Sequence, residues 1–149
     1  MAGTGFHRDI ANDELDIQLD GTVVCTLTTT SIALPTGPIT LGGRGTATQA
    51  DNHQTAVTIN ATSGIITLFS VDLAAGAESQ FIVNNTTVAA LDTVVCCVGV
   101  NGDAGEGFAT VSDVDATNGA FSIVLYNPSG VAGFNGATTV NFAVIKSVA

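Results

Sequence analysis

Short segments in which apolar residues recur at every second position, separated by glycine-containing turns, constrain this chain more than any other feature. In residues 120–126, for example, Phe121, Ile123 and Leu125 would share one face of a strand. Dipeptides such as Asn118-Gly119 separate these segments, at positions where a positive backbone φ costs little. The expected strands are residues 22–28, 56–61, 65–70, 80–84, 93–100, 107–114, 120–126 and 138–145.

This pattern predicts an all-β fold, either an antiparallel β-sandwich or a jelly-roll-like barrel, with an N-terminal arm. Gly64 is expected to separate two of the strands, and residues 93–100, apolar at consecutive positions, are expected to form a central strand. No segment with helical periodicity is long enough for a crossover between parallel strands. Residues 12–19 are compatible with one helical turn that Asp13 would cap.

A stretch rich in proline and glycine, residues 35–45, divides the chain. We expect an N-terminal arm and first strand in residues 1–34 and a β-sandwich module in residues 45–149. The strand at residues 22–28 is expected to join the main sheet. Residues 1–19 would then be either an arm that lies on a neighbouring subunit or a frayed terminus.

Composition and charge exclude several classes of protein. The chain of 149 residues has 3 basic and 13 acidic residues and a formal net charge of −10, so it cannot present the basic face that nucleic acids require. Its longest apolar run, residues 94–100, is far shorter than the roughly 20 residues of a membrane span. With 46% hydrophobic and only 11% charged residues, the composition is also unlike that of a disordered chain.

The sequence contains little that could support catalysis. His7 and His53 lie in no recognisable catalytic motif, and His53, in a polar stretch, is expected to be solvated. Cys25, Cys96 and Cys97 are expected to be small buried apolar residues, with the adjacent thiols of Cys96 and Cys97 pointing to opposite faces of a strand. We therefore expect neither an enzyme nor a bound cofactor.

One segment could bind a cation. Residues 101–106 place oxygen ligands at alternate positions, as calcium loops do, and Asp113 and Asp115 could converge with them. A hairpin turn with solvated acidic residues explains the same pattern, so no metal site is assigned.

Several segments resemble a small β-rich module of structural proteins in tailed bacteriophages of the marine type. The resemblance covers about residues 45–146 and is carried by Thr48-Gln49-Ala50, residues 55–60, 63–67 and 73–77, and the ending at residues 140–146. It implies a virion protein, either a head decoration protein or a fibre-tip module, and it brings no catalytic residues. Residues 1–20 lack the apolar stretch of a secretory signal, which fits synthesis in a reducing bacterial cytoplasm.

The first expectation is a capsid decoration (cement) protein on the outer surface of the head, which forms a homo-oligomer, such as a trimer, and contacts the major capsid protein. The apolar residues of the arm would make this contact: Phe6, Ile10, Leu15 and Ile17. The alternative is a tail-fibre or receptor-binding tip that recognises a host surface glycan through Phe108, Tyr126 and Phe134. A secreted carbohydrate-binding domain comes third, because the chain has no Trp and a single Tyr.

Overall fold

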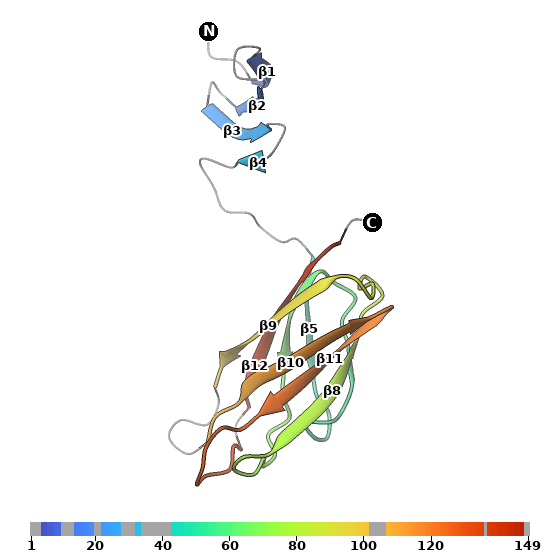
Figure 1. Ribbon diagram of the computed structural model, residues 1–149, viewed down its shortest axis with the longest axis vertical. Helices are drawn as coiled ribbons and strands as arrows, with labels where there is room; N and C mark the ends of the chain where they lie inside the picture. The colour runs from blue at the N-terminus through green and yellow to red at the C-terminus, as the bar shows by residue number, and fades with distance from the viewer. Residues whose placement is uncertain are drawn as a thin grey trace. The chain divides into compact units, whose positions relative to one another are not determined.

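The chain forms two compact β-units, Met1–Thr40 and Leu41–Ala149 (Figure 1). The computed structural model describes residues 4–9, 14–19, 22–27, 32–33, 43–101, 107–135 and 137–147. All regular secondary structure in these residues is β-strand, which confirms the all-β prediction. Among them, no helix is long and apolar enough to cross a membrane.

The N-terminal unit is a four-stranded antiparallel sheet in which each strand pairs with the next. Its strands are β1 (Gly5–Asp9), β2 (Glu14–Leu19), β3 (Thr22–Leu27) and β4 (Ile32–Ala33). Two sequence-based predictions are therefore wrong. The strand at residues 22–27 pairs with β2 and β4 instead of joining the main sheet, and residues 14–19 are a strand instead of a helical turn. Leu15 and Ile17 alternate with polar residues, which suits a strand. Pairing with β3 then stabilises the strand over a helical turn.

The second unit is a sandwich of two four-stranded sheets. One sheet has the order β10-β11-β8-β6 and the other β5-β7-β12-β9, which gives an open sandwich and no closed barrel. The pairing is antiparallel except at two edges, where β5 runs parallel to β7 and β6 parallel to β8. The strands are β5 (Arg44–Thr48), β6 (Val57–Thr58), β7 (Ser63–Thr67), β8 (Glu78–Asn84), β9 (Thr93–Val100), β10 (Thr110–Thr117), β11 (Ala120–Tyr126) and β12 (Thr139–Ile145).

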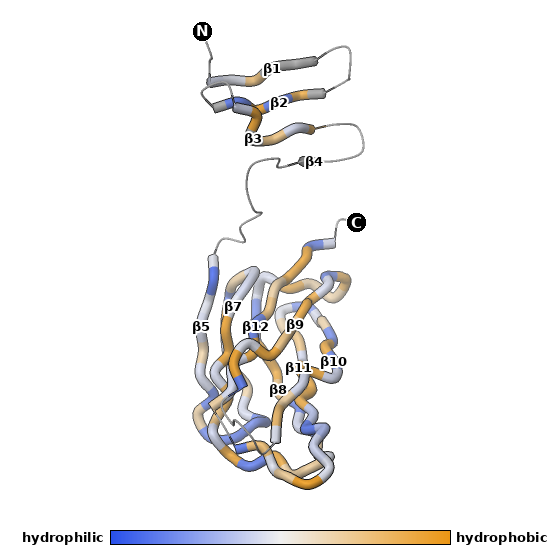
Figure 2. Tube along the Cα trace, turned by 90° about the vertical axis from the view of Figure 1, so that its left-hand side faces the viewer, coloured by the Kyte–Doolittle hydropathy of each residue, from blue (hydrophilic) through white to orange (hydrophobic). Residues whose placement is uncertain are grey.

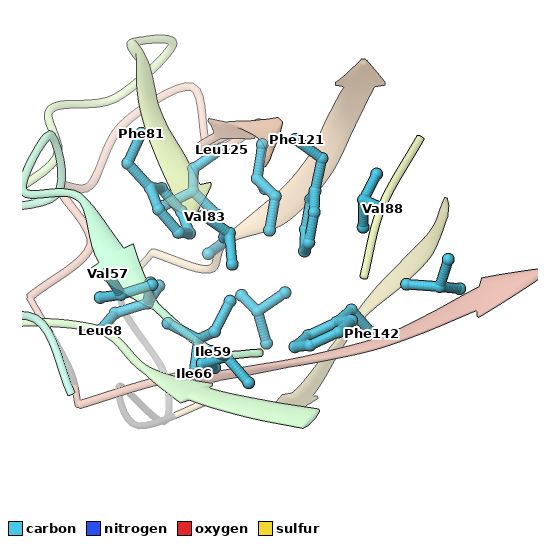
Figure 3. Packing of buried hydrophobic residues seen from close by; sticks show 14 of the residues in the cluster. Val57, Ile59, Ile66, Leu68, Phe81, Val83, Val88, Phe121, Leu125 and Phe142 are labelled. Atoms are coloured by element: carbon cyan, nitrogen blue, oxygen red, sulfur yellow. The ribbon is translucent and has the colours of Figure 1, made fainter. Parts of the chain in front are cut away.

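The hydrophobic core lies between the two sheets and follows the predicted alternation (Figure 3). Every second residue of β11 is buried, and the same holds for β8 and β12. Phe121 from one sheet meets Phe142 from the other, with ring centroids 5.1 Å apart and planes tilted by 56°. Such tilted aromatic pairs add to the hydrophobic stabilisation of a core.

Gly64 does not separate two strands, as predicted, but lies within β7. It pairs with Phe142 of β12, and a Cβ atom at this position would overlap the Phe142 ring. The glycine is therefore required by close packing of the neighbouring strand.

Strand β9 is an edge strand, which contradicts the prediction of a central strand at residues 93–100. Among the described strands it pairs only with β12. Val94, Cys96 and Val98 pack against the core, whereas the residues between them are exposed. One face of β9 therefore packs against the core, and the apolar residues of its other face are exposed to solvent.

Candidate interaction surfaces

Five apolar residues of the N-terminal sheet share one face, which we call the N-terminal apolar face. Phe6 pairs directly with Ile17, and Ile17 pairs with Cys25 on its other side. Leu15, two residues before Ile17, pairs with Leu27. Directly paired residues of antiparallel strands project to the same side, so the five side chains form one surface.

The N-terminal apolar face is open to solvent. Phe6 is 77% exposed and Leu15 is 38% exposed, while Ile17, Cys25 and Leu27 are partly buried. The opposite face is polar, and there the Thr26 hydroxyl donates a hydrogen bond of 2.6 Å to Asp16 Oδ1. The sheet is amphipathic, and among the described residues of its unit no second layer covers the apolar side.

The structure brings together three of the four predicted capsid contacts, Phe6, Leu15 and Ile17, on this face; Ile10 lies outside the described residues. Cys25 and Leu27 complete the face. The sequence analysis did not include these two residues in the contact surface, because it expected their strand to join the main sheet. Their alternation with Thr26 was nevertheless a signal that they share a face.

The three predicted aromatic platforms of the receptor-contact loops have different environments. Phe108 is 47% exposed, and Tyr126, at the end of β11, is partly buried. Phe134 is fully buried and is not a surface platform. An isolated bridge ties its backbone to Leu73, with N···O distances of 2.7 and 2.9 Å, and this bridge holds its ring in the core.

The ring of Phe134 stacks on His53, with centroids 5.7 Å apart. His53 is only 3% exposed, so the prediction of a solvated histidine is wrong. The side-chain amide of Gln49 is buried and holds the loop that contains His53. Its Nε2 donates hydrogen bonds to the carbonyl oxygens of His53 at 3.3 Å and Thr55 at 3.0 Å.

Burial lowers the pKa of His53 below its ordinary value, because desolvation disfavours the imidazolium. A hydrogen bond to the backbone of Phe69 and the charge of Asp72 oppose this shift without cancelling it. The Nε2 atom is buried and has no hydrogen-bond partner. The ring is therefore held neutral.

A shallow cavity of about 320 Å³ adjoins this histidine, and its polar lining includes Asp72, Glu78 and Ser79. Because Nε2 has no partner, His53 does not hydrogen-bond to the Ser79 hydroxyl through that atom, as a nucleophile–base pair would require. This geometry suits packing of the loop against the core.

The cysteines differ in environment. Cys97 is exposed on β9, which corrects the expectation that all three would be buried. Cys96 faces the core, and burial, together with the neighbouring Cys97, raises its pKa to about 12. The Cys96 thiol is therefore protonated and unreactive at neutral pH.

Residues 102–106 of the suggested calcium loop lie outside the described residues. Asp113 and Asp115 are exposed on the outer face of β10, where they pair with Val124 and Ser122. The described residues contain no group of three or more His, Cys, Asp or Glu side chains that could hold a metal ion.

Comparison of the chain with protein-family models, with curated proteins and with solved structures gives no match.

Proposed function

We propose that this chain is a bacteriophage capsid decoration protein, which binds the outer surface of the head through its N-terminal apolar face. The observation that carries the proposal is the clustering of Phe6, Leu15 and Ile17 on one exposed side of a sheet, which no described strand of the same unit covers. The unit Met1–Thr40 is at the size below which a chain seldom builds a sufficient core alone, so a partner on the apolar side would stabilise it.

The capsid shell supplies that partner. Covering apolar surface contributes about 25 cal/mol per Å². Repetition of a modest contact over many equivalent sites makes attachment effective without one tight site.

The first test is the copy number per particle, measured by quantitative mass spectrometry of purified virions against the major capsid protein. A decoration protein gives a simple fraction of the shell subunit. Absence from particles contradicts the proposal.

The second test is binding of the full chain to undecorated shells. The double variant Phe6→Ser/Leu15→Ser removes two anchors and is expected to lose binding, because it makes the N-terminal apolar face polar. The double variant Phe108→Ser/Val131→Ser, which changes exposed residues of the sandwich loops, is the matched control and is expected to bind normally. Unchanged binding by the first variant would show that another surface makes the contact.

One observation favours the alternative of a receptor-binding tip. The segment at Gly107 packs against Gly133, since a Cβ atom at Gly107 would lie 2.6 Å from the Gly133 carbonyl oxygen. Phe108 and Val131, which is 96% exposed, thus belong to adjoining loops. A copy number of a few per particle, with host adsorption lost in Phe108→Ser/Val131→Ser, would support this alternative.

A further inference from the structure

The side chain of His53 is buried at one end of the sandwich with one of its two ring nitrogens unpaired. Strands β5 and β7 run parallel, so the segments that follow them, residues 49–55 and 68–73, lie at the same end of the sandwich, the lower end in Figure 2. His53, in the first segment, makes a hydrogen bond to the backbone of Phe69 in the second. Its Nε2 atom has no hydrogen-bond partner in the described part of the chain.

The hydrogen bond to Phe69 indicates which ring nitrogen carries the proton. This bond raises the pKa of His53, as a bond that the ring donates to a carbonyl oxygen does. Because Nε2 is unpaired, Nδ1 is the donor, and Nε2 is the unprotonated nitrogen of the neutral ring. A second proton must therefore bind at Nε2, where the described residues offer it no acceptor. The buried position thus disfavours the imidazolium through its geometry as well as through desolvation.

The backbone of the loop is held by bonds that do not involve the imidazole ring. Gln49 Nε2 donates to the carbonyl oxygens of His53 and Thr55. Gln49 Oε1 accepts a hydrogen bond of 3.2 Å from the backbone N–H of Phe69. The ring itself is held by its own bond to Phe69 and by its stack on Phe134. The ring can therefore change its position while the loop backbone stays in place.

The cavity beside His53 offers the negative charge that a protonated ring needs. His53, Asp72 and Glu78 all line this cavity of about 320 Å³, and the charge of Asp72 already acts on the imidazole. Among the described residues, no basic one lines the cavity. Asp51, the other charged residue of the loop, is exposed and lies outside the lining. The segment packed on the ring, residues 129–135, contains no titratable residue.

We propose that His53 is a pH-dependent side-chain switch, in which the protonated ring leaves Phe134 and turns into the cavity, where Asp72 and Glu78 balance its charge. The neutral ring favours the buried position, and the imidazolium favours the acidic cavity, which is open to solvent. Acidification therefore shifts the population between two positions of one side chain. The movement uncovers the apolar ring of Phe134 at this end of the sandwich. This inference does not rest on the proposed function.

The first test follows His53 in the full chain by NMR spectroscopy from about pH 7.5 to about pH 4.5, with a His7→Gln variant to assign its signals. At the upper pH we expect nuclear Overhauser contacts between the rings of His53 and Phe134. These contacts should be lost as His53 titrates below its ordinary value of 6.5. The amide signals of Gln49 and Thr55 and the circular dichroism spectrum should stay nearly constant.

Three results of this experiment would overturn the proposal. The first is a ring that titrates and keeps its contacts to Phe134, which would mean that the imidazolium is accepted in the buried position. The second is loss of these contacts together with the whole fold, which would mean global unfolding. The third is a His53 ring that stays neutral down to the lowest pH.

The second test asks whether the cavity carboxylates receive the ring. In Asp72→Asn/Glu78→Gln the open position loses its charge partners, so the loss of the contacts to Phe134 should move to lower pH by about half a unit or more. Asp51→Asn is the matched control, because it removes a carboxylate of the same loop that does not line the cavity. It is expected to leave the midpoint nearly unchanged. Equal shifts in the two variants would contradict a role of the cavity, since the overall charge of the chain would then explain both.

Discussion

At the residue scale, buried amide side chains hold the loops of the sandwich. Asn127 is fully buried, and its Nδ2 donates to the carbonyl oxygens of Leu73 at 2.9 Å and Ala132 at 3.0 Å. Its Oδ1 accepts from the backbone N–H of Ser129 at 3.1 Å. Asn85 acts in the same way, donating to the Ala61 carbonyl oxygen at 2.7 Å. These side chains satisfy backbone groups that have no strand partner.

Replacing Asn127 with Leu is therefore expected to destabilise the protein by about 1–3 kcal/mol, because the partly buried Ala132 carbonyl oxygen loses this donor and the Leu73 carbonyl oxygen keeps only the backbone N–H of Phe134. Urea denaturation measures the change. The control is Asn84→Leu at an exposed position of β8, where we expect a change within about 0.5 kcal/mol. Equal effects of the two substitutions would show that the Asn127 contacts do not support the loop.

Also at this scale, burial of His53 makes stability depend on pH. Its pKa is lowered in the folded protein from the ordinary value of 6.5, so protons bind the unfolded chain more readily. Stability should be complete above about pH 6.5 and should fall as the pH drops from there towards the lower folded pKa.

The His53→Phe variant keeps an aromatic ring on Phe134 and has no titrating group. In a His7→Gln background, the free energy of unfolding of this variant should change less between pH 7.5 and pH 5 than that of the chain with His53. Parallel pH profiles for the two chains would contradict a role for His53.

At the scale of elements, Asp92 fixes the end of β12. Its side chain is 1% exposed and accepts hydrogen bonds from the backbone N–H groups of Ala89 at 2.8 Å and Ser147 at 3.0 Å, and it forms an ion pair with Lys146. The Lys146 contact, followed by the Ala89 hydrogen bond, lowers the pKa of Asp92 from 3.8 to about 2. The turn before β9 is thus joined to the segment after β12.

The Asp92→Asn variant should have a lower Tm at pH 7, because it loses the ion pair and has fewer acceptor sites. A carboxylate with a lowered pKa contributes stability above about 3.8, and this contribution is lost as the pH falls to about 2. The Tm difference from wild type should therefore shrink over that range. Asp115→Asn, at an exposed position, should show no such difference at pH 7. A gap in Tm that does not change with pH would mean that packing, and not charge, explains the effect of Asp92→Asn.

Elements were predictable to different degrees. Residues 120–126 form a strand with the predicted bounds, because its alternation is regular and Asn118-Gly119 provides the hairpin, with Gly119 at φ +83°. Strand β10 begins at Thr110 and not at residue 107, since Gly107–Ala109 packs against the neighbouring loop instead of pairing. The position of β9 at an edge was not visible, because an exposed apolar row and a buried one look alike in sequence.

At the scale of the whole molecule, the buried apolar core belongs to one unit. The described core residues extend from Val57 to Val144, all within Leu41–Ala149. The N-terminal sheet contributes its exposed apolar face.

The sequence by itself determined the β class, most of the sandwich strands and the faces that form the core, because the two-residue period of a strand is a local property of the chain. It also identified Phe6, Ile10, Leu15 and Ile17 as the apolar residues of the N-terminal arm. Only the tertiary structure decided that the three of them that the structure describes share a face with Cys25 and Leu27, that His53 is buried against Phe134, and that β9 lies at an edge. These features depend on contacts between segments far apart in the chain, which local periodicity does not encode.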